Sequence, residues 1–192
     1  ENGKVYFTDA TTKFSAKAFG GTLNASLLEI LEHRGNGRLI EYTPSTGKSK
    51  VIMDGLVFAN GVAVSHDQAS VLVNETGNYR VLRYWLGGPR SGQVDIVIDN
   101  LPGFPDNISA ARNGGYYVGL ASPRSSAVDK LADSPFLRKI VQRLPKLLRP
   151  QGQAYGHLIK ISERGEIELS LQDPTGAFPF TTGAIETDEE LY

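Results

Sequence analysis

An internal repeat is the feature that most constrains how this chain can fold. Residues 54–62 (DGLVFANGV) recur as residues 99–108 (DNLPGFPDNI), at a spacing of 45 to 46 residues. A third copy begins at Asp173 and continues through residues 178–180 (FPF). This period matches one four-stranded blade of a β-propeller. The repeat therefore predicts an all-β propeller, of which the 192 residues would form about four blades.

The other strand-like runs agree with this prediction. They are short, rich in β-branched and aromatic residues, and separated by turn sequences such as Arg164-Gly165. These runs are residues 4–8, 38–42, 50–53, 61–64, 70–73, 81–85, 95–98, 115–119, 158–161 and 166–171. The first run begins almost at the start of the sequence, and a further run, 190–192, ends it. We therefore expect residues 1–192 to form one partial propeller domain from which the N-terminal blades are absent.

Two segments depart from the β pattern and predict helical insertions. Residues 24–33 (NASLLEILEH) carry apolar side chains at helical spacing. Residues 134–149 start with Ser134-Pro135, an N-cap followed by a proline at the first helical position. This second segment is basic and amphipathic, so it could lie on a membrane surface or over the mouth of a site. We favour the simpler alternative, in which it packs on the top face of the propeller.

Composition excludes several classes of function. The formal net charge of −1 gives no general attraction to nucleic acid. The absence of cysteine rules out a disulfide framework, a thiolate zinc site and a cysteine nucleophile. No run of about 18 apolar residues occurs, so we expect no integral membrane segment. The sequence also lacks a glycine-rich phosphate loop, an HExxH element and a GxSxG element.

Polar residues occupy equivalent positions in successive copies of the repeat. Asn60 lies in the first copy and Asp106 with Asn107 in the second, each just before a buried, strand-like run. Asp9 follows the run 4–8 in a similar way. Oxygen ligands that converge from neighbouring blades suit Ca²⁺, which binds about six to eight carboxylate, amide and backbone oxygens. The alternative is that these side chains only cap turns at blade corners, and the residues alone leave both hypotheses open.

These elements resemble a known family. The segment FANGVAVSHDQASVLVNETGNYRVLRYWL, followed by DNLPGFPDNIS, SPFLRKIVQRLP, YGHLIKI and LQDPTGAFPF, is similar to bacterial members of the strictosidine-synthase-like family over nearly the whole chain. The FANG and DNIS elements also resemble the calcium-dependent, six-bladed propellers of the paraoxonase and gluconolactonase type. The resemblance implies six blades, a soluble protein of the bacterial cytoplasm or periplasm, and calcium bound by Asn60, Asp106 and Asn107. Asp9 falls where paraoxonases have an asparagine ligand, which implies an altered fourth ligand.

Two departures from these families bear on the chemistry. Paraoxonases place a histidine after the strand that matches residues 116–119, whereas this chain has Leu-Ala-Ser at 120–122. The plant synthase uses a glutamate at the place that aligns with Thr182, which argues against the condensation of tryptamine with secologanin. His157, at the start of a strand, is the better histidine candidate for catalysis, with a hydrogen-bonded structural role as the alternative.

Together these observations predict a metal-assisted hydrolase that acts on a lactone or a small ester. The ion would polarise the substrate carbonyl, and Asp106 would position water. The rival hypothesis is a non-catalytic propeller that binds a small molecule or a protein on its loop face, with the ion tying blades together. Strictosidine synthase activity on an alkaloid-like substrate is a third hypothesis. Unpaired strands at the open edges of a partial propeller could also join two copies of the chain.

Overall fold

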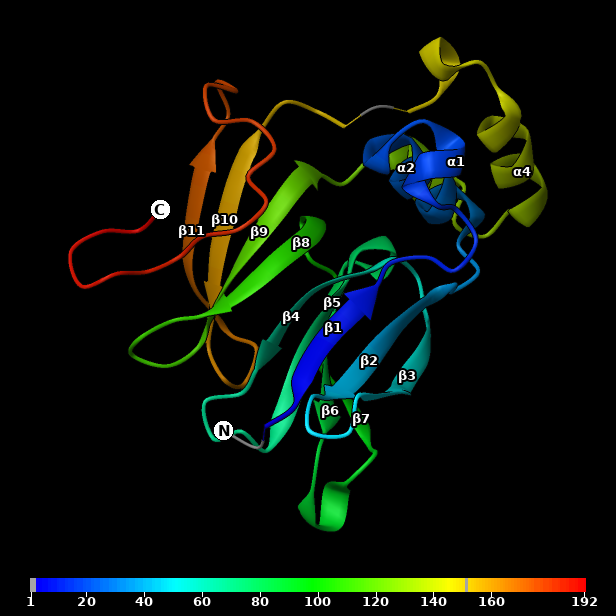
Figure 1. Cartoon of the computed structure of the whole chain (residues 1–192). Coiled ribbons are helices and arrows are strands. Elements are labelled where there is room, and N and C mark those ends of the chain that lie inside the picture. Colours follow the sequence, from blue (N-terminus) through cyan, green and yellow to red (C-terminus); the bar gives the residue numbers. More distant parts are fainter. Residues whose placement is uncertain (1–2, 151) are drawn as a thin grey trace.

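Three antiparallel sheets form the body of the protein (Figure 1). The computed structural model describes residues 3–150 and 152–192. The first sheet contains β1 (Val5–Asp9), β2 (Gly37–Thr43) and β3 (Lys48–Leu56). The second contains β4 (Ala59–Val64), β5 (Ser70–Glu75), β6 (Arg80–Trp85) and β7 (Val94–Ile98). The third contains β8 (Gly103–Ala110), β9 (Tyr116–Pro123), β10 (Gly156–Ile161) and β11 (Ile167–Asp173).

Within each sheet, every strand pairs with the next one along the chain. Strand β5 of the second sheet is buried on both faces. Since side chains alternate across a strand, its successive residues pack toward opposite neighbouring sheets. In β5, Val71 and Val73 pack toward the first sheet, in a cluster with Leu39. Leu72 faces the other way and packs with Tyr116 and other residues of the third sheet. Four-stranded antiparallel sheets stacked face to face are the blades of a β-propeller, so the predicted fold class is confirmed.

The expected number of blades is too high. The described residues form three sheets rather than about four. The expected number assumed that the whole chain forms strands, whereas part of its length forms the helical segments. Residues 174–192 contain no extended strand. The expected strand 190–192 forms only an isolated bridge, in which Leu191 lies opposite Glu186 and Tyr192 exchanges two backbone hydrogen bonds with Ile185 (2.8 and 2.9 Å). This segment still lies along β8, where the Asn107 amide donates to the Thr182 carbonyl (2.7 Å).

The helices gather at one end of the sheets (Figure 1). Between β1 and β2 lie α1 (Ala16–Phe19) and α2 (Thr22–Glu32). Between β9 and β10 lie α3 (Ser126–Lys130) and α4 (Pro135–Arg143). Short 3₁₀ turns occur at Thr76–Asn78, Gly88–Arg90 and Lys146–Leu148. None of the helices in the described residues has the length and apolar character needed to span a bilayer.

The N-terminus of α4 differs in one detail from its prediction. Ser134 holds the N-cap position and Pro135 the first helical turn, as expected. The Ser134 hydroxyl, however, makes no capping hydrogen bond to the helix.

A buried carboxylate fixes α2 to the first sheet. Glu29 is fully buried and accepts hydrogen bonds from the Thr11 hydroxyl (2.7 Å), the Asn36 amide N–H (3.1 Å) and the Asn36 side-chain amide (2.9 Å). Thr11 follows β1 and Asn36 precedes β2, so Glu29 closes the base of the helical insertion. Because a buried charge is stable only when its oxygens are hydrogen-bonded, this arrangement holds α2 in a defined position over the strand ends.

Candidate active site

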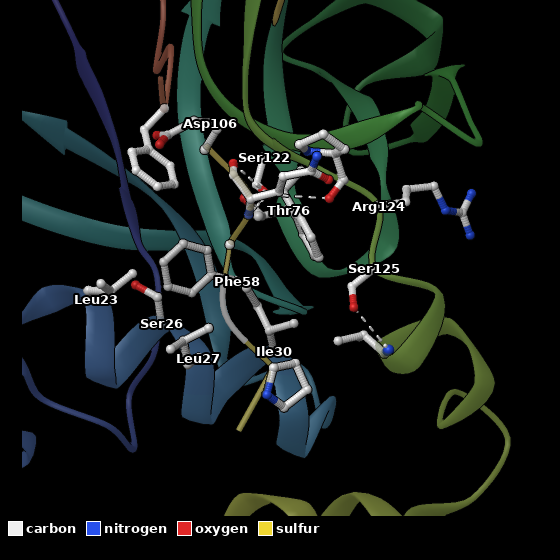
Figure 2. A pocket seen from close by; sticks show the side chains of 18 of the residues that line it. Leu23, Ser26, Leu27, Ile30, Phe58, Thr76, Asp106, Ser122, Arg124 and Ser125 are labelled. Carbon is white, nitrogen blue, oxygen red and sulfur yellow. Dashed lines mark hydrogen bonds between the residues drawn. The ribbon is translucent and has the colours of Figure 1, made fainter. Parts of the chain in front are cut away.

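A cavity of about 460 Å³ lies between α2 and the strand ends. Figure 2 shows Leu23, Leu27 and Ile30 of α2 on one side of it, facing Thr76, Asp106 and Ser122 on the other. Residues before and after α4 complete the wall, among them Val128 and Gln153. The cavity therefore has apolar sides and a small polar floor, which is the usual construction of a small-molecule site.

The three copies of the repeat each contribute a phenylalanine to this cavity. Phe58, Phe104 and Phe180 all line it, and each lies two residues before a polar side chain: Asn60, Asp106 or Thr182. Phe58 and Phe180 both adopt a φ of 58°, in the left-handed region that bulky side chains rarely occupy. Strain of this kind persists only where the surroundings fix the backbone, and it concentrates at functional sites.

Asn60 and Asp106 meet at the polar floor. Burial raises the pKa of the Asp106 carboxyl above its ordinary value, and a hydrogen bond with the Asn60 side chain opposes this rise. The Asn60 amide also donates to the Thr76 hydroxyl (3.3 Å), which in turn donates to the Pro105 carbonyl (2.6 Å). No basic side chain of the described residues forms an ion pair with Asp106. The floor thus contains a half-buried carboxylate without a counter-charge.

Asn74 is a site residue that the sequence reasoning missed. It is fully buried, and its side-chain N–H donates to the Asp106 carbonyl (2.8 Å). Its Oδ1 atom is buried and has no hydrogen-bond partner among the described residues. The available signal was an asparagine directly continuing the apolar run 71–73 of a buried strand. A buried oxygen without a hydrogen-bond partner is costly and calls for an explanation. Asn74 Oδ1 is such an oxygen, on a side chain that contacts Asp106.

Asn107 and Asp9, the other two predicted ligands, lie outside the cavity lining. Asn107 is exposed, next to Asp106 on β8. Asp9 pairs with Arg38, which contacts its Oδ2 through Nη2 (2.8 Å) and Nε (2.9 Å). The preceding Thr8 donates its hydroxyl to the Asn60 carbonyl (2.6 Å), so β1 lies beside β4 at this point. The role of both residues in a metal site stays a prediction.

His157 lies away from this cavity. It lines a separate cavity of about 380 Å³ and, from β10, contacts the Ser170 hydroxyl through Nε2 (3.0 Å). Burial lowers the pKa of its imidazole. The ring has the hydrogen-bonded environment of the structural alternative, and its catalytic role stays a prediction.

The donor set at the floor fits a hard cation. In the described part of the chain, no three His, Cys, Asp or Glu side chains come together as metal ligands. Two amide side chains contact Asp106 instead: Asn60 hydrogen-bonds to its carboxyl group, and Asn74 donates to its main-chain carbonyl. Amide and carboxylate oxygens are ligands that Ca²⁺ accepts, whereas zinc favours nitrogen and sulfur. Asn60 and Asp106 are the lining residues with oxygens that would suit such an ion, while Asn107 stays a predicted ligand.

The fold defines the class of this protein as a β-propeller, with a cavity at the ends of its inner strands. The solved structure of a luciferin-regenerating enzyme has the same fold, with a TM-score of 0.53 and 18% identity over 90% of this chain and 43% of that one.

The sequence relatives then give the family. A family model described as strictosidine synthase matches residues 1–89. The adipocyte plasma membrane-associated protein of Rattus norvegicus is 35% identical over 98% of this chain and 50% of its own length. STRICTOSIDINE SYNTHASE-LIKE 13 of Arabidopsis thaliana is 36% identical over 91% of this chain and 43% of its own. The likeness to strictosidine-synthase-like proteins that the motifs predict is thus confirmed, and the chain spans about half the length of the curated relatives it matches. The predicted bacterial origin stays a prediction.

Proposed function

We propose that the cavity binds a small neutral lactone or ester and that the protein hydrolyses it with the help of a calcium ion. The observation that carries this proposal is the Asp106 carboxylate, which is half-buried at the floor of an apolar cavity and lacks a basic partner in the described residues. A carboxylate in this environment can hold a cation or accept a proton from water. The resemblance to calcium-dependent lactonases supports the same chemistry.

The lining residues favour a neutral substrate. Arg124 is the one basic residue among the described residues of the lining, and its guanidinium serves other groups. It lies over the Tyr79 ring (4.2 Å) and pairs with Asp129 (3.1 Å). Figure 2 shows its side chain directed away from the cavity. An anionic substrate would therefore find no basic side chain to pair with, while a hydrocarbon group would pack against the phenylalanine side chains.

Each floor residue has a distinct part in the proposed reaction. Asn60 orients the Asp106 carboxylate through its amide, and Thr76 fixes the Asn60 amide in turn. Asp106 directs water toward the substrate carbonyl and takes up a proton as the water attacks. It returns this proton to the alkoxide that leaves when the acyl carbon–oxygen bond breaks. Calcium, when bound by Asn60, Asp106 and Asn107, would supply positive charge to the developing oxyanion.

Calcium titration by calorimetry on the purified protein, with a lactone and aryl-ester screen, tests this proposal. Wild-type protein is expected to bind calcium and to hydrolyse a substrate of the screen. Asn60→Ala and Asp106→Asn should lose both properties. Asp54→Asn, which removes an exposed carboxylate from β3, is the matched control and should keep both. Hydrolysis that persists in Asp106→Asn at the wild-type rate would overturn the proposal.

The same experiment separates the non-catalytic alternative. In that case calcium binds and depends on Asn60 and Asp106, the protein resists heat better with calcium, and no substrate turns over. The close approach of β4 and β8 at Gly61 supports this alternative. An ion bound by Asn60 and Asp106 beside this contact would join the second sheet to the third.

A further inference from the structure

The segment around α4 concentrates positive charge. Residues 134–150 contain five basic residues and no acidic residue, in a chain with a net charge of −1. The basic residues are Arg138, Lys139, Arg143, Lys146 and Arg149. The nearest acidic residues along the chain are Asp133 and Glu163. This segment is therefore a local cationic patch that the composition of the whole chain hides.

Three of the apolar residues of α4 are exposed, and a fourth, Val141, is half-buried. Phe136 is 72% exposed, and Leu137 and Ile140 are exposed as well. The helix instead contacts α2 through a polar residue, since Gln142 donates its side-chain N–H to the Leu28 carbonyl (3.1 Å). This orientation is the reverse of the packed arrangement that the sequence favoured. Burial of these side chains thus does not explain why the helix is amphipathic.

The exposed apolar surface continues beyond the helix. In the following 3₁₀ turn, Leu147 is 92% exposed and Leu148 is 63% exposed. With Phe136, Leu137 and Ile140 they form what we call the α4 surface, which Lys139 and Arg143 accompany as exposed cations. Five large apolar side chains exposed within 13 residues are more than the isolated exposed apolar residues of an ordinary surface, and such concentrations mark interaction sites.

We propose that the α4 surface docks on an anionic lipid bilayer. The apolar side chains enter the boundary between headgroups and acyl chains, and Lys139 and Arg143 pair with lipid phosphates. An amphipathic helix with bulky apolar residues on one side and basic residues beside them has the composition of an interfacial helix. Charge selects this occupant, because the segment has five cations and nothing acidic to repel an anionic surface.

Docking would place the cavity next to the lipid. The chain just before α4 lines the cavity with Ser125 and Val128, and the chain just after the segment lines it with Pro150 and Gln153. The helix α2, which contacts α4, supplies the apolar wall. An apolar compound dissolved in the bilayer would thereby have a short path to the cavity. This inference is independent of the hydrolase proposal, since it concerns binding alone.

Vesicle co-sedimentation of the purified protein tests the inference. Vesicles of phosphatidylcholine with about one third phosphatidylserine should bind the protein, and pure phosphatidylcholine should bind it at least about tenfold more weakly. Raising the salt from about 0.1 M to about 1 M should weaken binding, because it screens exposed charges. The variants Phe136→Ser/Leu147→Ser and Lys139→Gln/Arg143→Gln should each reduce the vesicle partition coefficient by at least about tenfold.

Two matched controls isolate the α4 surface. Val94→Ser/Ile96→Ser removes exposed aliphatic side chains from β7, and Lys48→Gln/Lys50→Gln removes two exposed cations from β3. Both should bind like wild type, with folding of all variants checked by circular dichroism. Failure to bind anionic vesicles, or equal losses in the control variants, would overturn the inference. So would a dimer in light scattering that Phe136→Ser/Leu147→Ser abolishes, since a second copy would then cover the surface.

Discussion

The backbone of Gly61 lies directly against that of Asp106. A Cβ atom on Gly61 would stand 2.5 Å from the Asp106 carbonyl oxygen and 2.6 Å from the Asn107 Cα. No side chain fits at this distance, so glycine is required where β4 crosses β8. The contact brings Asn60, the residue before Gly61, to the Asp106 carboxylate at the cavity floor.

We expect Gly61→Ala to separate the two strands. The added methyl group must push β8 away, which should lower the free energy of unfolding by about 1 to 3 kcal/mol. Urea unfolding measures this change, and calcium titration would show the accompanying loss of a joint Asn60 and Asp106 site. Gly87→Ala is the control, because a Cβ there meets no atom within 4 Å and should leave stability nearly unchanged.

Asp106→Asn should stabilise the protein at neutral pH when calcium is removed by chelation. Burial raises the pKa of Asp106 in the folded state, with the Asn60 hydrogen bond acting against it. The folded state therefore binds this proton more tightly than the unfolded state. The protonated Asp106 side chain therefore contributes to the free energy of unfolding. This contribution is complete below the ordinary aspartate pKa of about 3.9 and is lost as the pH rises through the raised pKa of the folded state.

Thermal unfolding at two pH values checks this expectation. The melting temperature of Asp106→Asn should exceed that of wild type near neutral pH, and the difference should disappear in acid. A variant that is less stable than wild type at neutral pH without calcium would show that Asp106 already has a stabilising partner.

Acidification should destabilise the protein through two histidines, the buried His157 and the half-buried His33. Burial lowers the pKa of His157, and burial together with the charge of Arg138 lowers that of His33. As the pH falls, the histidines therefore bind protons in the unfolded state before they do so in the folded state. The stability that the neutral imidazoles provide is present above about pH 6.5 and is lost as the pH falls through the lowered pKa values of the folded state.

His157→Gln should flatten the loss of stability between about pH 7 and about pH 5, and His33→Gln/His157→Gln should flatten it further. Chemical denaturation across this range is the measurement. An unchanged slope in both variants would place the acid sensitivity in other groups. Nuclear magnetic resonance of the His157 imidazole, whose Nε2 contacts the Ser170 hydroxyl, would follow its protonation directly.

Glu29→Ala should release α2 from the first sheet. The substitution leaves the Thr11 hydroxyl and the Asn36 backbone N–H without their acceptor, while the Asn36 side chain keeps only its hydrogen bond to Glu32 (3.2 Å). This loss should cost about 2 to 4 kcal/mol. Leu23→Ala, at an exposed position of the same helix, should change stability by less than about 0.5 kcal/mol. Hydrogen exchange should show faster opening of Thr22–Glu32 in Glu29→Ala alone. Equal protection in both variants would mean that α2 is held by its apolar contacts.

Short-range patterns predicted most of the strands because alternation and β-branching are local properties. The repeat also placed Asn60 and Asp106 at equivalent positions, and the structure brings these two together. Contacts between residues far apart in the sequence could not be predicted from such local patterns. The pairing of Asp9 with Arg38 requires β1 and β2 to meet across the helical insertion. Periodicity likewise gives α4 an apolar side without saying whether that side faces the protein or the solvent.

Very short elements were also missed. α1 has four residues and α3 has five, which is too little for a helical period to become visible. These helices and their connections take up chain that the repeat length assigns to strands, which explains why three sheets replace the expected four.

The phenylalanines at 58, 104 and 180 have a consequence for how such a site can diversify. Each belongs to a separate copy of the repeat and covers its own sector of the cavity wall. Mutation can therefore enlarge or narrow one sector while the strands of the other copies keep their positions. In proteins of this construction, substitutions at one such position can change ligand preference while the strands that hold the polar floor stay as they are.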